Sequence, residues 1–223
     1  LTADHVLFNS QYHHDSFYHE GLRLLKHFPD HHELDIIEKI KEKSQVLYLG
    51  MDLSKFDQHK IESQGNPLVL WNHRWEYDKN PKAFIRSLME LNEEGIRFSF
   101  AVTGENSPKD FEAIKSQFGR LSEFMVSSGY LPRSEYISLL SKTDVVVSSS
   151  MHEFFGISVV EALSAGAVPV LPKRLSYPEV VPEQWHDFAF YSDEGITDRL
   201  REVLKDVESW KKNVAGLAEA MRR

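Results

Sequence analysis

The chain has 223 residues, 41% of them hydrophobic and 27% charged, which suits one large domain or one domain with part of another. The net charge of −8 argues against a generally basic nucleic-acid-binding domain, and the lack of cysteine excludes disulfides, thiol nucleophiles and cysteine-based zinc sites. No apolar run approaches the roughly 18 residues of a membrane span, so we expect no membrane partner. Because the opening has neither an initiator Met nor a basic, apolar leader, we expect a piece of a longer protein.

The first 66 residues differ in pattern from the rest. Short apolar runs predict strands at Val6–Phe8 and Val46–Leu49, and a charged stretch of helical character separates them. Residues 57–66 are polar and have the composition of a linker. We therefore predict that residues 1–56 are the end of an incomplete N-terminal domain, that residues 57–66 join two domains, and that residues 67–223 form the second domain.

Residues 1–45 lack the neighbours that a complete domain would supply, and we expect them to expose apolar surface. They are also rich in histidine. His27 and His31 lie one helical turn apart, but a proline intervenes and no second cluster completes a site, so we predict no bound metal. His13 and His14 are adjacent on a predicted helix and are expected to face solvent.

From residue 67 onward, strand-like and helix-like segments alternate. The strand candidates are residues 67–73, 96–104, 124–131, 143–150, 167–171 and 188–192. The helix candidates are residues 81–95, 107–119, 134–142, a segment that begins near 156, and residues 193–206 and 207–222. The β-branched run at 143–150 is typical of a parallel strand covered on both faces. Repeated β-α units predict the α/β class, with a Rossmann-like, doubly wound parallel sheet.

Two glutamates eight positions apart flank a glycine in the segment MHEFFGISVVEALSAGAVPVL, residues 151–171. Glu153 falls in the loop after a predicted strand, and a helix begins near Gly156. In open α/β sheets, ligands bind outside the carboxyl ends of the strands, where the next helix presents free N–H groups. Glu161 on that helix suits a pair of ribose hydroxyls, and Glu153 suits another hydroxylated group. A solvent-exposed acidic first turn is an equally good interpretation of Glu161 alone.

A second polar constellation, WNHRWEYDKNP, follows another predicted strand. Its Arg74 and Lys79 suit a diphosphate, the arginine as a planar fork and the lysine as a point charge. Taken alone, two such cations fit a solvated surface better, and Glu76 and Asp78 are placed to neutralise them.

Neighbouring aromatic and histidine side chains are weaker candidates. Trp71, Trp75 and Tyr77 are more typical of core packing than of stacking on a base. His73 and His152 adjoin the two constellations and could border the same cleft. The chain contains no GxxxxGK[ST] P-loop, no GxGxxG after a strand and no GxSxG elbow, which argues against P-loop nucleotide binding and a dinucleotide oxidoreductase.

The segment EFFGISVVE, followed by ALSAGAVPV, resembles the E-x7-E motif of retaining GT-B glycosyltransferases of the glycogen synthase and sucrose synthase-like group, family four. The two cations five apart also match this group, as do GYLPRSEYISLLSKTDVVVSSS before the motif and the early segments ADHVLFNS and LYLGMDLSKFD. The resemblance covers nearly the whole chain. It implies that residues 67–223 are the C-terminal, donor-binding domain of a GT-B enzyme and that residues 1–56 are a partial piece of its N-terminal domain.

The resemblance also implies roles for individual residues. Arg74 and Lys79 would hold the donor diphosphate, Glu153 would contact the donor sugar, and these three would take part in transfer. Residues that would bind the donor besides these three are Tyr130 and Leu131, whose backbone would border the base, the loop residues Phe155, Gly156 and Ile157, and Glu161, which would bind the ribose. Transfer would need no metal or other cofactor, because protein cations and helix N–H groups would stabilise the leaving diphosphate.

More narrowly, WNHRWEYDKNP and KRLSYPEVVP resemble the tRNA-queuosine mannosyltransferase branch of this group. That branch implies GDP-mannose as donor and queuosine in tRNA as acceptor, for a cytoplasmic or nuclear enzyme. Asn80 stands where the wider group has glycine, and RLSYPE stands where it often has GGxxE, which weakens any inference of the sugar from the wider group. The alternatives are another nucleotide sugar and acceptor, or a nucleotide-sugar-binding piece without turnover. We expect these 223 residues alone to bind a donor but to turn over poorly.

Overall fold

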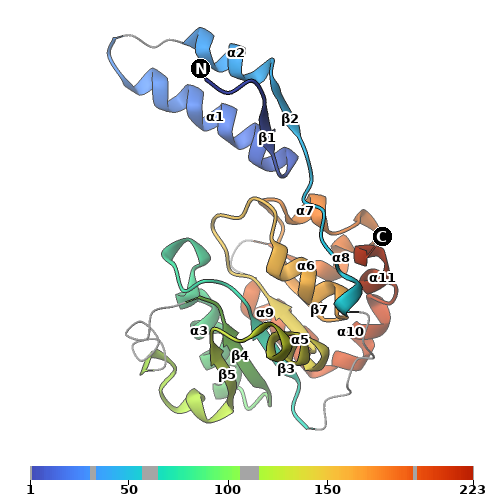
Figure 1. Cartoon of the computed structure of the whole chain (residues 1–223). Helices are drawn as coiled ribbons and strands as arrows, with labels where there is room; N and C mark the ends of the chain where they lie inside the picture. Colours follow the sequence, from blue (N-terminus) through green and yellow to red (C-terminus); the bar gives the residue numbers. More distant parts are fainter. Residues whose placement is uncertain (1, 31–33, 57–64, 106–115, 193–194, 223) are drawn as a thin grey trace.

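The structure is a computed structural model that describes residues 2–30, 34–56, 65–105, 116–192 and 195–222. Figure 1 shows a small unit and a larger α/β unit, connected by an extended segment. Within the described ranges, no helix is both long enough and apolar enough to cross a membrane. The predicted linker at residues 57–66 falls largely outside the described residues.

The small unit is made of β1 (Val6–Phe8), α1 (Gln11–His27), α2 (Leu34–Lys41) and β2 (Ser44–Val46). Its two strands pair in parallel. Among the described residues, the buried side chains of its core are Phe8, Tyr18 and Ile37. A two-stranded sheet over so small a core is marginal as an independent fold.

The second strand of the small unit lies earlier than predicted, so the prediction of a strand at Val46–Leu49 is wrong. β1 ends at Phe8 because Ser10 caps the helix that follows, and Phe8 pairs with Val46. After this pair, Leu47 donates one last backbone hydrogen bond to Phe8 at 2.7 Å, and β1 offers no further residue to pair with. The segment is exposed instead, with Tyr48 at 57%.

The larger unit contains one six-stranded parallel sheet with the order β5-β4-β3-β6-β7-β8. Its strands are β3 (Leu68–Trp71), β4 (Ser99–Thr103), β5 (Met125–Gly129), β6 (Val145–Val147), β7 (Val168–Pro172) and β8 (Phe190–Tyr191). Within this sheet, the chain first forms the central strand β3, continues outward through β4 and β5, and then returns to form β6 on the other side of β3. This confirms the predicted Rossmann-like, doubly wound sheet. The reversal between β3 and β6 is the kind of switch point at which such sheets bind ligands.

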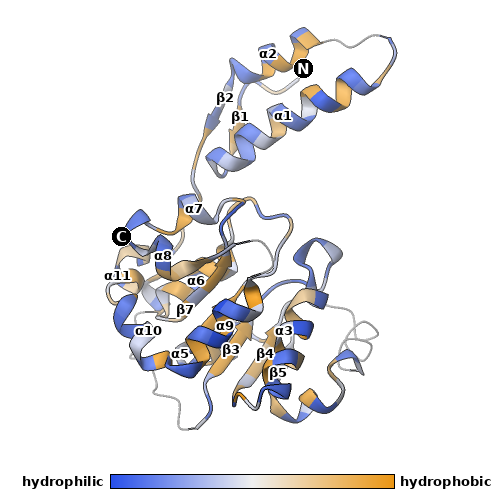
Figure 2. Cartoon of the chain, turned by 180° about the vertical axis from the view of Figure 1, so that it is seen from behind, coloured by the Kyte–Doolittle hydropathy of each residue, from blue (hydrophilic) through white to orange (hydrophobic). Residues whose placement is uncertain are grey.

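Helices cover both faces of this sheet (Figures 1 and 2). They are α3 (Pro81–Glu93), α5 (Arg133–Lys142), α6 (Ile157–Ser164), α7 (Tyr177–Val180), α8 (His186–Ala189), α9 (Ile196–Lys205), α10 (Val207–Asn213) and α11 (Leu217–Arg222). α3 packs with α9, and α6 packs with α11. Every residue of β3 and β6 is buried, as expected for parallel strands covered on both faces.

Several segments differ from the predicted elements. The predicted helix at 107–119 lies largely outside the described residues, which resume at Ser116. The predicted helix at 207–222 is wrong as a single element, because Gly216 adopts a left-handed φ of 85° and separates α10 from α11. The last strand is shorter than residues 188–192, since α8 runs up to Ala189. Neither α7 nor α8 was predicted.

The core of the larger unit begins before its first strand. Leu53 and Phe56 are 8% and 3% exposed and pack in that core, although both fall within residues 1–56, the predicted end of the N-terminal domain. The guanidinium of Arg133 lies 5.2 Å from the centre of the Phe56 ring. The short 3-10 helix Ser54–Phe56 is therefore part of the larger unit in packing terms.

Candidate functional site

The predicted polar residues lie at the carboxyl ends of β3 and β6, on either side of the switch point. β3 ends at Trp71, and Arg74 and Lys79 follow within eight residues. β6 ends at Val147, and Glu153 follows in the loop that leads to α6. Because β3 and β6 are neighbours and run parallel, the two loops open at the same edge of the sheet.

The structure brings Lys79 and Glu153 together. The Lys79 side chain is 10% exposed, and its Nζ lies 3.4 Å from Glu153 Oε2 and 3.2 Å from Asp78 Oδ2. Nζ also donates a 2.6 Å hydrogen bond to the carbonyl oxygen of His152. Two carboxylates and a carbonyl thus fix one ammonium group in a nearly buried position, which is expensive unless the charge has partners.

The Glu153 carboxylate is held from its other side by the loop backbone. Its Oε1 accepts N–H groups from Phe154 at 3.1 Å and from Phe155 at 3.4 Å. Gly156, at the start of α6, has a φ of 92°, and a Cβ there would lie 3.1 Å from Tyr177 Cε1. The backbone conformation therefore favours glycine, and the close aromatic ring leaves little room for a side chain.

Tyr177 supports this loop from beneath. The side chain is fully buried, and its hydroxyl shares a 2.7 Å hydrogen bond with Ser148 Oγ, just past the end of β6. Burial, with a further contribution from the nearby Glu153 carboxylate, raises the pKa of Tyr177 well above its ordinary value. The phenol therefore stays neutral and serves as a fixed wall of the site.

Glu161 lies on α6 and forms an ion pair with Arg133, whose Nη1 is 2.8 Å from Glu161 Oε1. Its carboxylate also interacts with the hydroxyl of Tyr136 on α5, and burial first, then this charge, raises the pKa of Tyr136. Asn72 donates from Nδ2 to Tyr136 Oη at 3.0 Å and to the carbonyl oxygen of Ser158 at 2.7 Å. One network therefore joins the end of β3 to α5 and α6.

Arg74 is placed differently from the other predicted residues. Its side chain is 58% exposed and pairs with Glu76 at 3.2 Å, the neutralising contact that the sequence suggested. In the described part of the chain, its guanidinium forms no ion pair with Glu153 or Glu161. The structure thus groups Lys79 with Glu153, while Arg74 stands at the exposed rim.

A cavity of about 270 Å³ lies beside this network. Its lining comprises Asn72, Thr103, Gly104, Glu105, Tyr130, Leu131, Arg133 and Tyr136. Asn72 Oδ1 and Thr103 Oγ1 are buried there without a hydrogen-bond partner among the described residues. Since both N–H groups of the Asn72 amide are already donated, the cavity offers a ligand an acceptor oxygen. Tyr130 and Leu131, predicted to border a base, form part of its wall.

The strand ends around this cavity are packed very closely. A Cβ on Gly104 would lie 2.2 Å from the carbonyl oxygen of His73, so only glycine allows β4 and β3 to end side by side. His73 is buried, and its Nε2 has no hydrogen-bond partner among the described residues. Burial, with the Lys79 charge, lowers the pKa of His73 to about 3, so the ring is neutral.

The remaining candidates are placed as follows. Trp71 is a core residue, whose Nε1 donates to Ser149 Oγ at 3.0 Å, whereas Tyr77 is 85% exposed. The prediction that His13 and His14 face solvent is wrong: His13 stacks on Phe154, and the His14 side chain is 15% exposed. Within the described ranges, no cluster of three His, Asp or Glu residues is arranged to hold a metal ion.

Sequence reasoning missed four residues of this site: Asn72, Thr103, Arg133 and Tyr136. Asn72 and Thr103 lie at the ends of predicted strands, which is a usable signal. Arg133 and Tyr136 lie on α5, and only the packing of α5 beside α6 brings them to Glu161.

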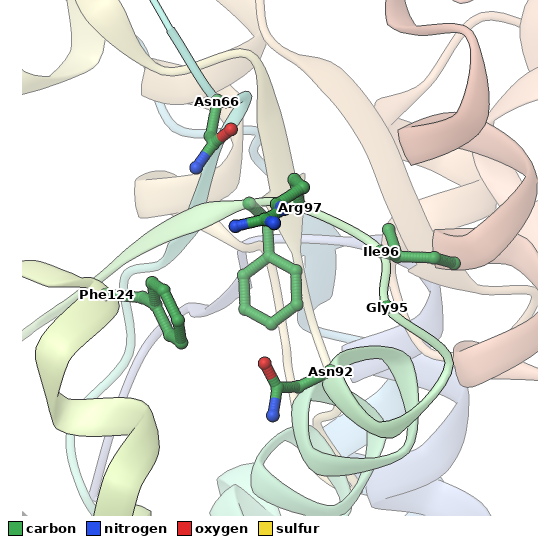
Figure 3. Close-up of a pocket in the computed structure, with 7 residues that line it drawn as sticks. Asn66, Asn92, Gly95, Ile96, Arg97 and Phe124 are labelled. Atoms are coloured by element: carbon green, nitrogen blue, oxygen red, sulfur yellow. The ribbon is translucent and has the colours of Figure 1, made fainter.

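Figure 3 shows a different pocket of about 260 Å³, lined by residues such as Asn66 and Phe124. That pocket adjoins the amino ends of β3 and β4, away from the predicted residues.

Two family models match the chain. The model described as glycosyl transferases group 1 matches residues 54–220, and the model described as tRNA-queuosine alpha-mannosyltransferase N-terminal matches residues 1–51. The chain is 36% identical over 196 residues to a tRNA-queuosine alpha-mannosyltransferase of Drosophila melanogaster, with 82% of this chain and 51% of that protein covered. It is 27% identical over 164 residues to a 2-deoxystreptamine glucosyltransferase of Streptomyces kanamyceticus, with 73% and 37% covered.

Solved structures share the fold at lower identity. Anabaena Alr3699/HepE in complex with UDP-glucose superposes with a TM-score of 0.71 at 18% identity, covering 99% of this chain and 59% of that one. The catalytic domain of starch synthase IV from Arabidopsis thaliana gives 0.69 at 15% identity, covering 99% and 52%. The chain spans about half the length of the first of these two curated relatives and 37% of the second. Because its family model covers residues 54–220, more than half of the chain, the chain belongs to the glycosyl transferases group 1 family.

Proposed function

We propose that the protein containing this chain is a retaining glycosyltransferase and that the larger unit binds its nucleotide-sugar donor. The observation that carries this proposal is the cluster at the switch point. There the nearly buried Lys79 is paired with Glu153. The helix that begins after Gly156 carries Glu161, which belongs to the neighbouring hydrogen-bond network with Arg133. Such a cluster fits a ligand that has both anionic and hydroxyl groups.

Each part of the donor then has a matching group. Lys79, Arg74 and the backbone of Phe155–Ile157 stabilise the diphosphate as negative charge develops on it. Glu153 contacts the sugar, and Glu161 binds the ribose. The cavity beside Asn72 and Thr103 takes the base, whose N–H groups can donate to Asn72 Oδ1. Because the two cations supply positive charge at the leaving group, this scheme includes no metal or other cofactor.

Donor binding in this scheme requires an exchange of partners. The three N–H groups of Lys79 already face Asp78, Glu153 and the His152 carbonyl, so a phosphate oxygen must replace one of them. The side chain of Asp78 is 30% exposed and that of Glu153 is 17% exposed. We therefore expect the phosphate to displace Asp78 from Lys79. Arg133 must likewise release Glu161 before that carboxylate can accept ribose hydroxyls.

We further propose GDP-mannose as the donor and queuosine in tRNA as the acceptor. This finer assignment is supported by the match of residues 1–51 to an N-terminal model of that description and by the relative from Drosophila melanogaster. With a net charge of −8, this chain repels a polyanion overall. We therefore place the tRNA contacts on local basic groups or outside these 223 residues.

The decisive experiment uses the full-length protein with radiolabelled GDP-mannose and two tRNA samples, one with queuosine and one without. Label should enter only the first sample, and Glu153→Gln should depress that transfer while leaving GDP affinity nearly unchanged. Equal labelling of both samples would contradict queuosine as acceptor. Transfer to neither, from any nucleotide sugar, by a protein that still binds GDP would favour a binding protein without turnover.

The base needs a separate measurement, because the cavity accepts N–H donors from more than one base. Calorimetry with GDP, UDP and ADP on the same protein compares the three directly. Thr103→Val, which keeps the side-chain shape and removes the hydroxyl, should weaken the preferred nucleotide by roughly threefold to tenfold. Thr103→Ser is the matched control and should restore binding. An unchanged affinity in Thr103→Val would place the base elsewhere.

A further inference from the structure

The first helix of the small unit begins on a carboxylate of the larger unit. Glu179 of α7 accepts the backbone N–H of Gln11 at 2.7 Å and that of Tyr12 at 2.5 Å, one with each carboxylate oxygen. The hydroxyl of Tyr48, in the segment between the two units, lies 3.4 Å from the same carboxylate. In Figure 1, α7 lies at the boundary between the units, next to that segment.

This contact completes the cap of α1. The first N–H groups of a helix have no partners within it, and a negative charge is favoured there by the helix dipole. Ser10 Oγ accepts the N–H of His13 at 3.0 Å, which leaves the two earlier N–H groups to Glu179. Ser10 from the same segment and Glu179 from the larger unit therefore cap α1 together. The cap is complete only when the two units are docked.

A second contact joins the same helix start to the loop of the candidate site. The ring of His13 stacks on the ring of Phe154, with centroids 4.0 Å apart and an interplanar angle of 24°. His13 is held in place by Asn9, whose Oδ1 is 2.8 Å from its Nδ1. Phe154 follows Glu153 directly and donates its own N–H to that carboxylate.

α7 connects these two contacts through the inside of the larger unit. Its Tyr177 faces inward, against Gly156 and Ser148 of the candidate site. Its Glu179, two residues later, faces outward to α1. One short helix thus braces the loop of Glu153 on one side and receives the small unit on the other.

We propose that Glu179 and Phe154 are positioning residues that dock the start of α1 onto the larger unit, so that the orientation of the small unit and the placement of the Glu153 loop are set together. The docking itself is independent of the activity proposed above. Its consequence for transfer rests on that proposed function, because it assumes that Glu153 contacts the donor sugar and that the acceptor binds on the side of the small unit.

A distance measurement tests the docking directly. The described sequence contains no cysteine, so Arg23→Cys on α1 and Lys142→Cys on α5, both exposed, can carry two spin labels in the full-length protein from which any other cysteines have been removed. We expect a narrow distance distribution in the parent, which broadens in Glu179→Ala and in Phe154→Ala. Glu179→Gln keeps one good acceptor oxygen and should restore part of the order. The controls Glu183→Ala and Phe28→Ala remove the same residue types from exposed positions elsewhere.

Kinetics then separate positioning from folding. Glu179→Ala should bind GDP as the parent does, unfold at nearly the same temperature, and transfer roughly tenfold more slowly, with the loss in kcat and acceptor KM. Unbroadened distances in both Glu179→Ala and Phe154→Ala would overturn the docking proposal. If distances broaden but the parent itself transfers no sugar, the docking stands and the proposed function fails.

Discussion

The two units of the chain differ in the size of their hydrophobic cores. In the larger unit, one core cluster runs from Leu53 to Leu217 and fills both faces of a six-stranded sheet. In the small unit, the buried cluster of the described residues is Phe8, Tyr18 and Ile37 beneath two short strands. The larger unit thus contains its own core and its own site, whereas the small unit depends on what it is attached to.

The small unit also exposes several large apolar side chains for its size. Leu7, Phe17 and Leu24 of the small unit are 51%, 43% and 61% exposed, and Phe28 is 52% exposed. This confirms the expectation that residues 1–45 present apolar surface. Figure 2 shows apolar segments along α1 and α2, whereas in the larger unit the apolar residues concentrate in the strands. The comparison teaches that the small unit is built to be covered by, or docked against, other parts of a protein.

The largest expected difference between the two units appears when the chain is cut between them and each piece is unfolded separately. Residues 52–223, which keep Leu53 and Phe56, should unfold cooperatively, whereas residues 1–51 alone should lack a cooperative transition, because their core is too small. Urea unfolding followed by circular dichroism distinguishes the two. A sigmoidal transition for residues 1–51 would show that the small unit is self-sufficient.

Within the larger unit, the two predicted diphosphate cations should differ sharply in their effect on stability. Lys79→Ala leaves two partly buried carboxylates close together without their cation, and should cost about 3 kcal/mol. Arg74→Ala removes an exposed ion pair and should cost less than about 0.5 kcal/mol. Both should weaken GDP binding by roughly tenfold to a hundredfold. Urea titration and calorimetry give the two quantities; equal stability losses would mean that Lys79 is not buried as described.

A third test uses pH and the buried histidine of the larger unit. In the folded state the pKa of His73 is lowered from its ordinary 6.5 to about 3, so below pH 6.5 only the unfolded chain takes up this proton. Stability is therefore complete above pH 6.5 and falls as the pH falls toward 3. Between pH 7 and pH 5, the parent should lose about 2 kcal/mol more than His73→Gln. Parallel curves for the two proteins would show that the ring is solvated.

The smallest effect compares two glycines, one in each environment. Gly156→Ala forces a side chain into a left-handed backbone 3.1 Å from Tyr177 and should cost about 1–2 kcal/mol, with weaker donor binding. Gly50→Ala, in the segment between the units, meets no atom within 4 Å and should be nearly neutral. Thermal unfolding of the two variants checks the contrast, and a similar loss in both would remove the case for a glycine preference at 156.

Periodicity predicted most of the larger unit because its strands are short, apolar and evenly separated by helical segments. It failed where the local signal competed with tertiary context. β2 was displaced because its length is limited by Ser10, which ends its partner strand, and the last helix was predicted through Gly216 although an internal glycine can signal a break. α7 was missed because four residues carry no periodic pattern.

The site residues that could be predicted from the sequence are those in the loops that follow strand ends. Lys79 and Glu153 each follow a strand end, and their meeting depended on β3 and β6 being neighbours, which the doubly wound pattern implied. Arg133, Tyr136 and Glu179 could not be placed in the same way. Their partners lie on other elements, 28 residues away for Arg133 and 168 for Glu179, and only packing brings such residues together.

The cap of α1 also has a consequence for the order of events during synthesis. Gln11 is translated 168 residues before Glu179, the residue that accepts its N–H. At about 5–20 residues per second, the start of α1 waits roughly 8–34 s for its remote partner. Over that interval the first two N–H groups of α1 lack the carboxylate that receives them in the folded chain. The docking of α1 on the larger unit is therefore expected to be a late event, which begins only once α7 has been made.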